Sequence, residues 1–249
     1  MLKHDPVSRG RREVLSAGGA LVLGAALLPM RARAQGGGDK LRIGVIGSGH
    51  IGGTIGGLWV KDGHEVLFSS RHPEELKELV AGLGGKAQAG TVQQAIDVGE
   101  VLFIAVPYAA LPQIGQDYGA AMKGKIMLDA CNAIAPRDGA TIAEEVEHEG
   151  VGVVSQKYLP AARLVRAFNT LNYKIFAAEA NRPDPRVAVP IAGDDAEAVK
   201  VAAGLVHDAG FDPVVVGKLA DASRFQRGAP GYGQVVSAAE LRQKLSLKP

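Results

Sequence analysis

The amino-acid sequence predicts an α/β fold, with a doubly wound, mostly parallel sheet of about eight strands in a single compact domain. Short apolar runs rich in β-branched residues alternate with helix-like stretches along residues 41–249, which is typical of parallel strands joined by helices. Glycines and prolines mark many of the boundaries between them. A G-x-G-x-x-G motif directly follows the first apolar run, as in dinucleotide-binding βαβ units.

Local signals justify the elements in order. The run 41–46 predicts a buried strand, and the helix over 50–61 should end at Gly63, which suits a left-handed C-cap. Pro73 fits the first turn of a helix that runs through Leu83. Ser237 and Glu240 form a capping-box pattern for a terminal helix. Further strands are expected at 65–69, 86–89, 101–106, 125–129, 164–168, 186–191 and 212–216, and further helices at 92–98, 194–209 and 237–245.

The glycine motif predicts where a dinucleotide binds. Gly47 permits a tight turn, Gly49 lets the backbone approach a pyrophosphate, and Gly52 allows close packing of helix on strand. The free N–H groups at the start of the helix would face the phosphates. The alternative is a glycine-rich turn needed only for packing. The expected binding residues of this loop are Gly47, Ser48, Gly49, His50, Ile51 and Gly52.

The end of the second predicted strand favours NADP(H) over NAD. An NAD-binding protein usually places a carboxylate there to bind the ribose 2′-hydroxyl. This chain has Ser69, Ser70 and Arg71, and Glu65 lies at the other end of the strand. Hydroxyls and a guanidinium suit a 2′-phosphate. The alternative for Arg71 is a solvated surface arginine.

Three further segments follow predicted strands and should form the floor around the nicotinamide ring. Ligands of doubly wound sheets lie outside the carboxyl ends of the strands, where these segments meet. Asn and Thr are also common after strands for reasons of turn geometry, so a structural role stays equally open for Asn132 and Asn169. The expected contacts are Val106, Pro107, Asn132, Ala167, Asn169 and Thr170.

No constellation for acid–base or nucleophilic catalysis is evident, and no catalytic residue is assigned. The histidines are scattered, and the single cysteine, Cys131, is interpreted as a small buried residue. No metal-ligand spacing appears, so no metal is expected. Hydride transfer is compatible with this pattern, because the cofactor carries the chemistry.

Residues 1–34 resemble a twin-arginine export signal. Arg11 and Arg12 precede an uncharged stretch, and an A-x-A site predicts cleavage before Gln35. The translocase of that route would be a transient partner, and the mature protein would be periplasmic or otherwise exported, with no stable membrane span. The alternatives are an uncleaved membrane anchor and a disordered terminus without a targeting role. We expect a linker at 35–40, a nucleotide-binding core at 41–192, and an extension at 193–249 packed on the same domain.

Composition argues against nucleic acid as a partner. Aromatic residues make up 5% of the chain, too few for base stacking to dominate. The formal net charge of +2 arises from the leader, which holds six of the 28 Lys and Arg residues and two of the 26 acidic ones. The remainder therefore has a slight acidic excess and no electrostatic basis for binding a polyanion.

Several motifs together resemble the NADP oxidoreductases that depend on the deazaflavin coenzyme F-420. The segments are I-G-V-I-G-S-G-H-I-G-G (43–53), S-S-R-H-P-E (69–74), A-V-P-Y (105–108), L-D-A-C-N (128–132), L-V-R-A-F-N-T (164–170) and G-D-D-A-E-A (193–198). The nucleotide-binding domains of pyrroline-5-carboxylate reductase and of six-transmembrane metalloreductases look similar. The resemblance implies a Rossmann fold, pyrophosphate on residues 47–52, the 2′-phosphate on Ser70 and Arg71, and nicotinamide beside Val106, Pro107 and residues 167–170.

The sequence therefore predicts an NADPH-dependent oxidoreductase that exchanges hydride with a flat small-molecule acceptor. A flavin, a deazaflavin or a quinone-like ring fits the small residues expected beside the nicotinamide, such as Ala105, Ala130 and Ala133. Two alternatives stay open: a non-catalytic, exported NADP-binding protein, and a metal-ion reductase that works through a flavin. A homodimer is also left open.

Overall fold

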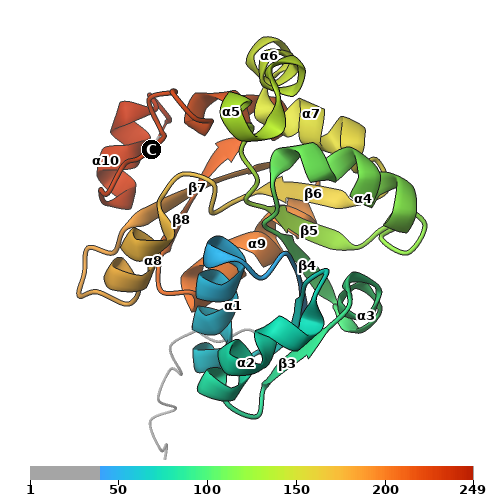
Figure 1. Ribbon diagram of the computed structural model, residues 1–249. Coiled ribbons are helices and arrows are strands. Elements are labelled where there is room, and N and C mark those ends of the chain that lie inside the picture. The colour runs from blue at the N-terminus through green and yellow to red at the C-terminus, as the bar shows by residue number, and fades with distance from the viewer. Residues whose placement is uncertain (1–39, 249) are drawn as a thin grey trace, which may run out of the picture. The chain divides into compact units, whose positions relative to one another are not determined.

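The computed structural model describes residues 40–248, whose strands form one eight-stranded sheet with helices on both faces (Figure 1). The strand order is β3-β2-β1-β4-β5-β6-β7-β8. The first six strands are parallel, in the order usual for a dinucleotide-binding fold. β7 is antiparallel to β6, and β8 is parallel to β7. The predicted α/β, Rossmann-like fold is thus confirmed.

The strands are β1 (Arg42–Ile46), β2 (Glu65–Ser69), β3 (Ala87–Gly90), β4 (Val101–Ile104), β5 (Ile126–Asp129), β6 (Arg163–Arg166), β7 (Ala188–Gly193) and β8 (Asp212–Gly217). The α-helices are α1 (His50–Asp62), α2 (Lys77–Leu83), α3 (Val92–Val98), α4 (Leu111–Tyr118), α5 (Ala135–Asp138), α6 (Ala140–Glu149), α7 (Val151–Tyr158), α8 (Tyr173–Glu179), α9 (Ala196–Asp208) and α10 (Ala238–Lys244). Three 3-10 segments, η1 (Pro73–Leu76), η2 (Tyr108–Ala110) and η3 (Leu219–Phe225), complete the described elements.

Two strands end two residues earlier than predicted. β4 ends at Ile104 instead of residue 106, and β6 ends at Arg166 instead of residue 168. The chain leaves the sheet early in both places, because these segments turn outward to shape a cleft at the carboxyl edge. The helices α4 to α8, between residues 111 and 179, were not predicted from the sequence. The predicted leader and residues 35–39 of the linker lie outside the described residues.

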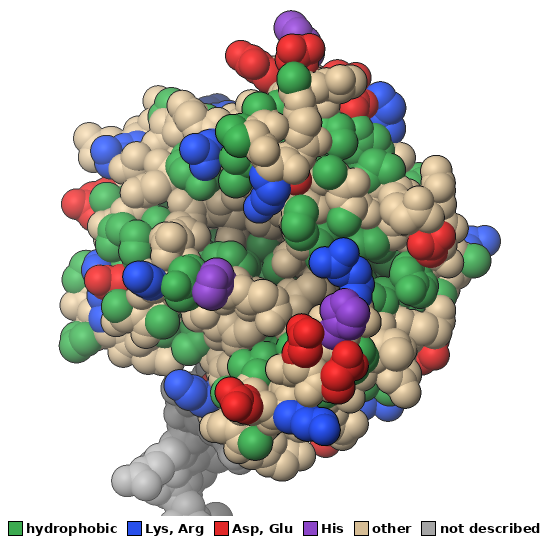
Figure 2. All heavy atoms as spheres, viewed as in Figure 1, with side chains coloured by type: hydrophobic (Ala, Val, Ile, Leu, Met, Phe, Trp, Pro, Cys, Tyr) green, Lys and Arg blue, Asp and Glu red, His purple; other side chains and the backbone are tan. Residues whose placement is uncertain are grey.

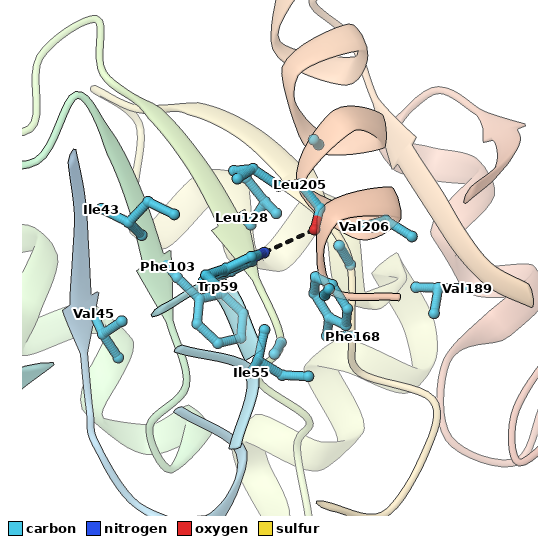
Figure 3. Close-up of a cluster of buried hydrophobic side chains, with 14 of the residues drawn as sticks. Ile43, Val45, Ile55, Trp59, Phe103, Leu128, Phe168, Val189, Leu205 and Val206 are labelled. Atoms are coloured by element: carbon cyan, nitrogen blue, oxygen red, sulfur yellow. Dashed lines mark hydrogen bonds between the residues drawn. The ribbon is translucent and has the colours of Figure 1, made fainter. Parts of the chain in front are cut away.

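Buried packing fixes the position of α1, whose first turn follows the glycine loop. The inner face of α1 carries Ile55 and Trp59, both fully buried. The Trp59 indole lies edge-on to Phe103 and Phe168, and its Nε1–H donates to the Leu205 carbonyl of α9 at 2.7 Å (Figure 3). A buried indole N–H needs such a partner. α1 is therefore joined to both β4 and α9, and its N-terminus has a fixed place at the sheet edge.

The second half of the chain continues the same sheet. Because β7 is antiparallel to β6, it begins on the carboxyl side of β6 and ends beside it, with Gly193 opposite Val165. The Ala188 N–H at the start of β7 donates to the Val236 carbonyl at 2.8 Å. The C-terminal segment thus returns to the edge where the glycine loop lies. No helix within residues 40–248 is long and apolar enough to cross a membrane.

Candidate functional site

The glycine loop joins β1 to α1 and is held by the end of β2. The backbone N–H groups of Gly47 and Ser48 and the Ser48 hydroxyl all donate to the Ser69 carbonyl, at 3.3, 3.1 and 3.0 Å. No side chain caps the N-terminus of α1. The first backbone N–H groups of this thirteen-residue helix therefore have no side-chain acceptor. An anion bound at the helix N-terminus would accept hydrogen bonds from them.

The three glycines of the motif differ in whether backbone angles or neighbouring atoms exclude a side chain. Gly47 has φ +93°, and a Cβ there would meet Val106 Cγ1 at 2.5 Å. A Cβ on Gly52 would overlap the Gly47 carbonyl oxygen. Gly49 has φ −75° and ψ −156°, which any residue can adopt, and a Cβ there would meet no protein atom within 4 Å. The fold requires Gly47 and Gly52, whereas the open space at Gly49 fits a bound group that approaches the backbone closely.

A cleft of about 590 Å³ opens beside this loop, and the space-filling view shows the surface hollowed between the start of α1 and α5 (Figure 2). Its size is usual for a small-molecule site. Seven of the predicted residues line it: Gly49, His50, Ile51, Val106, Pro107, Asn132 and Asn169. Ala105, Ala130 and Phe168, which the sequence also places near the nicotinamide, line it together with Cys131. The lining residues that the sequence did not single out are Ile134, Arg137, Leu171, Asn172, Tyr173, Arg227 and Tyr232.

Asn132 and Asn169 form the floor of the cleft as a hydrogen-bonded pair. Asn132 Nδ2 donates to the Asn169 carbonyl at 2.7 Å, and Asn169 Nδ2 donates to the Phe225 carbonyl at 3.2 Å. Asn169 is 2% exposed, and its Oδ1 has no hydrogen-bond partner among the described residues. An unpaired buried acceptor is costly, so this atom marks a place where a bound donor would be favourable.

Phe168, just before Asn169, has φ +59°. This left-handed conformation is unusual for a bulky side chain and costs on the order of 1–3 kcal/mol. The ring is fully buried and lies edge-on to Trp59, Phe103, Phe176 and Phe211. Packing in this aromatic cluster therefore fixes a backbone turn at the floor of the cleft.

A buried ion pair supports the floor from below. Arg166 and Asp129 have fully buried side chains and pair directly. Asp129 Oδ1 also accepts from the Cys131 N–H at 2.8 Å. Burial, followed by the nearby Asp129 charge, raises the pKa of the Cys131 thiol. Cys131 is 2% exposed, which confirms the interpretation as a small buried residue, and a thiol held protonated is a poor nucleophile.

The end of β2 places the residues predicted for the 2′-phosphate. Ser70 is half-buried and Arg71 is exposed, and both follow the Ser69 carbonyl that holds the glycine loop. Ser69 itself differs from the expectation. Its side chain is fully buried, and its hydroxyl donates to the Val45 carbonyl at 2.7 Å. That hydroxyl is committed to the sheet, which leaves Ser70 and Arg71 for a ligand.

Two other predicted residues lie beneath the surface of the cleft. Ala167 is fully buried in the core, and Thr170 is 2% exposed. The Thr170 carbonyl accepts from the Gly233 N–H at 3.0 Å. These residues connect the floor to the core and to the C-terminal segment, and Asn169 between them lines the cleft.

Two sides of the cleft were not predicted from the sequence. His50 stacks on Tyr173, with ring centroids 4.2 Å apart and planes 8° from parallel, so α8 closes one side of the cleft against the glycine loop. On the other side, Arg227 and Tyr232 come from the segment 226–233, which we call the C-terminal wall. Its Gly- and Pro-rich sequence, Q-R-G-A-P-G-Y-G, was the one available signal that a shaped loop lies there.

A second cavity of about 520 Å³ adjoins the first. It shares Asn132 and Arg227 with the cleft. Its other lining residues are Ala133, Ala143, Val146, Glu147, Val151, Gln226, Gly228 and Ala229. The two cavities meet at the end of the cleft that the sequence assigns to the nicotinamide.

A group with metal-ligand spacing lies at the other end of α1. Ligand atoms of Asp62, His64 and Asp208 are within 4.8 Å of one another. His64 Nδ1 accepts from the Leu41 N–H at 3.1 Å, so the ring proton is on Nε2, which is 3.0 Å from Asp208 Oδ2. A cation on Nε2 would require a proton on Nδ1 and would break the Leu41 bond. The geometry fits a hydrogen-bonded clamp between β1, α1 and α9.

Comparison with known proteins gives a family match over part of the chain. Residues 42–133 match the family described as NADP oxidoreductase, coenzyme F420-dependent, which confirms the resemblance over that stretch. The protein named Metalloreductase STEAP3, from Rattus norvegicus, is 28% identical over 185 residues, which cover 73% of this chain and 35% of that protein. Putative protein YjhV of Escherichia coli K12 is 49% identical over 47 residues, which cover 19% of this chain and 34% of that protein. The matches span about a third of the length of these relatives.

Solved structures share the fold. The hypothetical protein SMa0349 from Sinorhizobium meliloti aligns with a TM-score of 0.68 and 24% identity, over 80% of this chain and 95% of that one. A putative F420-dependent NADP-reductase from Arthrobacter sp. FB24 aligns with a TM-score of 0.63 and 22% identity, over 74% of this chain and 87% of that one. At these identities the likeness establishes the fold.

Proposed function

We propose that the protein is an NADPH-dependent oxidoreductase that transfers hydride between NADP(H) and a flat acceptor, such as a flavin, a deazaflavin or a quinone-like ring. The observation that carries the proposal is Gly49, a glycine that neither its backbone angles nor its protein neighbours require. A pyrophosphate that lies against the backbone explains this glycine. The family match over residues 42–133 supports the same cofactor.

Each part of the cleft has a role in this proposal. The first N–H groups of α1 bind the pyrophosphate, and Arg71 with Ser70 binds the 2′-phosphate. Val106, Pro107, Asn132 and Asn169 surround the nicotinamide. Bound NADPH supplies a hydride, and the acceptor completes its two-electron reduction with one proton from water. The role of the protein is to orient the two rings, and this role needs no acid–base residue of its own.

The test has two stages. Titration of the purified protein with NADPH and NADH, followed by fluorescence, should show binding with a preference for NADPH. Loss of nicotinamide absorbance should then follow when a flavin, a deazaflavin or a quinone is added. A protein that binds NADPH yet oxidises none of it with any acceptor class would be the non-catalytic binding protein. Absence of NADPH binding would contradict the proposal itself.

Metal-ion reduction through a flavin is a second candidate, because a relative over 73% of the chain is named a metalloreductase. The same assay separates it from the first candidate. Addition of a ferric chelate should accelerate NADPH oxidation only when a flavin is present. An equal rate without flavin would contradict a flavin-mediated route.

We also propose that the protein is exported by the twin-arginine route, on the basis of residues 1–34. Replacement of Arg11 and Arg12 by lysines should leave uncleaved precursor in the cytoplasm. A receptor that binds the arginine pair would use the planar guanidinium with its several donors, which lysine lacks. Cell fractionation and N-terminal sequencing measure this, with mature wild-type protein beginning at or near Gln35. Unchanged export of the double-lysine variant would contradict the route.

A further inference from the structure

We propose that the second cavity is a subsite for the acceptor, and that Arg227 binds a negatively charged substituent of that acceptor. This inference rests on the proposed hydride transfer at the nicotinamide end of the cleft. It adds what that function leaves open, namely the chemical class of the acceptor. The expected class is a planar ring that bears a phosphate or carboxylate group.

The two cavities share part of their lining. Asn132 and Arg227 line both cavities, so a molecule in the second cavity reaches the floor on which the nicotinamide would lie. Half of the other lining residues have small side chains or none, namely Ala133, Ala143, Gly228 and Ala229. Small side chains leave room for a flat ring to extend from the shared boundary into the second cavity.

The charges on this side of the cleft also favour an anion. Two arginines line the cleft on this side, but only one is neutralised. Arg137 pairs with Asp138 through Nη2 at 2.8 Å and also donates to the Asn132 carbonyl. Burial opposes ionisation of Asp138, but hydrogen bonds from Arg137, Ile134 and Ala109 outweigh it and lower the pKa of that carboxyl. Asp138 therefore stays charged and holds Arg137 in place.

Arg227 has no comparable partner. Within residues 40–248 its guanidinium forms no ion pair, and Arg227 is an exposed residue that lines both cavities. Glu147 is the carboxylate that lines the second cavity, and it would repel an anion that lay within that cavity close to it. The negative group is therefore expected at the junction, where an arginine binds phosphate or carboxylate with charge-assisted hydrogen bonds.

The C-terminal wall holds Arg227 in position. Asn169 Nδ2 donates to the Phe225 carbonyl at 3.2 Å, the Val151 N–H donates to Gln226 Oε1 at 3.0 Å, and the Gly233 N–H donates to the Thr170 carbonyl at 3.0 Å. The segment is thus anchored on both sides of Arg227. A preformed wall costs little ordering free energy on binding and so favours specificity.

The test compares FMN with riboflavin, which share a ring and differ by one phosphate. Flavin fluorescence gives the affinity of each for the full protein saturated with NADP⁺. We expect wild-type protein to bind FMN more tightly than riboflavin, and Arg227→Gln to weaken FMN roughly tenfold or more, the value of one charge-assisted hydrogen bond. Riboflavin affinity should change little. Arg42→Gln is the matched control, because it removes another exposed arginine, on β1, from a weak pair with Glu100.

The outcomes separate this inference from the proposed function. The anionic subsite would be overturned if Arg227→Gln lost affinity for FMN and riboflavin equally, or lost affinity for neither. It would also be overturned if wild-type protein bound FMN and riboflavin with the same affinity. A parallel loss of NADPH affinity in Arg227→Gln would also overturn the anionic subsite, because Arg227 would then act on the cofactor. Failure of wild-type protein to bind NADPH would instead overturn the proposed function.

Discussion

Gly49→Val should reduce NADPH affinity by roughly a hundredfold or more while leaving the fold intact. The new side chain would occupy the space in which a pyrophosphate contacts the first N–H groups of α1. Loss of two charge-assisted hydrogen bonds, each worth about 1.5–3 kcal/mol, gives at least that factor. The backbone angles of Gly49 suit valine, and a Cβ there meets no protein atom within 4 Å. NADPH titration and thermal unfolding on the same preparation measure both effects.

Gly52→Ala is the contrasting control. Its Cβ would overlap the Gly47 carbonyl oxygen, and overpacking of this kind costs roughly 1–3 kcal/mol. This variant should therefore lose stability, whereas Gly49→Val should not. Unchanged NADPH affinity in Gly49→Val would show that the loop is only a packing turn and would remove the main support for dinucleotide binding.

Arg71→Ala should weaken NADPH binding by roughly tenfold to a hundredfold and leave NADH binding almost unchanged. The difference arises because only NADPH carries the 2′-phosphate that Arg71 is expected to bind. One charge-assisted hydrogen bond is worth about 1.5–3 kcal/mol, and about 1.4 kcal/mol corresponds to a factor of ten. The ratio of the two affinities, from parallel titrations, is the measured quantity.

Salt provides a second check on Arg71. The side chain is exposed, so part of its contribution is Coulombic and screened. The difference in NADPH affinity between wild type and Arg71→Ala should become smaller at high ionic strength. Equal weakening of NADPH and NADH would mean that Arg71 supports the loop or contacts the adenine, and the preference for NADP(H) would lose its main support.

The elements around the glycine loop could be predicted from sequence because their signals are local. β2 and α3 have the predicted bounds, and Gly63 adopts the left-handed C-cap expected of it. The helices between residues 111 and 179 were missed because they are short and closely interrupted. Gly139 and Gly150, for example, separate α5, α6 and α7, so no apolar period runs long enough to be recognised.

The site was predicted where it depends on neighbours in sequence and missed where it depends on distant contacts. The chain just before the C-terminal wall is joined to the floor by the hydrogen bond between Asn169 and Phe225, residues 56 positions apart. Nothing local to either residue indicates that contact. Ser69 shows another limit. Four of the five β2 residues are buried, so the strand has no alternation that would reveal which way the Ser69 hydroxyl points.

The left-handed backbone at Phe168 gives the hydrophobic core a part in ligand selection. The conformation persists only while the surrounding rings hold it, since a free chain would return Phe168 to an ordinary backbone region. Phe211 packs edge-on against that ring, with centroids 6.4 Å apart, and does not line the cleft. Phe211→Leu should therefore weaken NADPH binding as well as lower the free energy of unfolding. Titration and denaturant unfolding of this variant would show whether the two losses occur together, and undiminished affinity would contradict the link. Substitutions deep in this protein would then change its ligand affinity without touching the ligand.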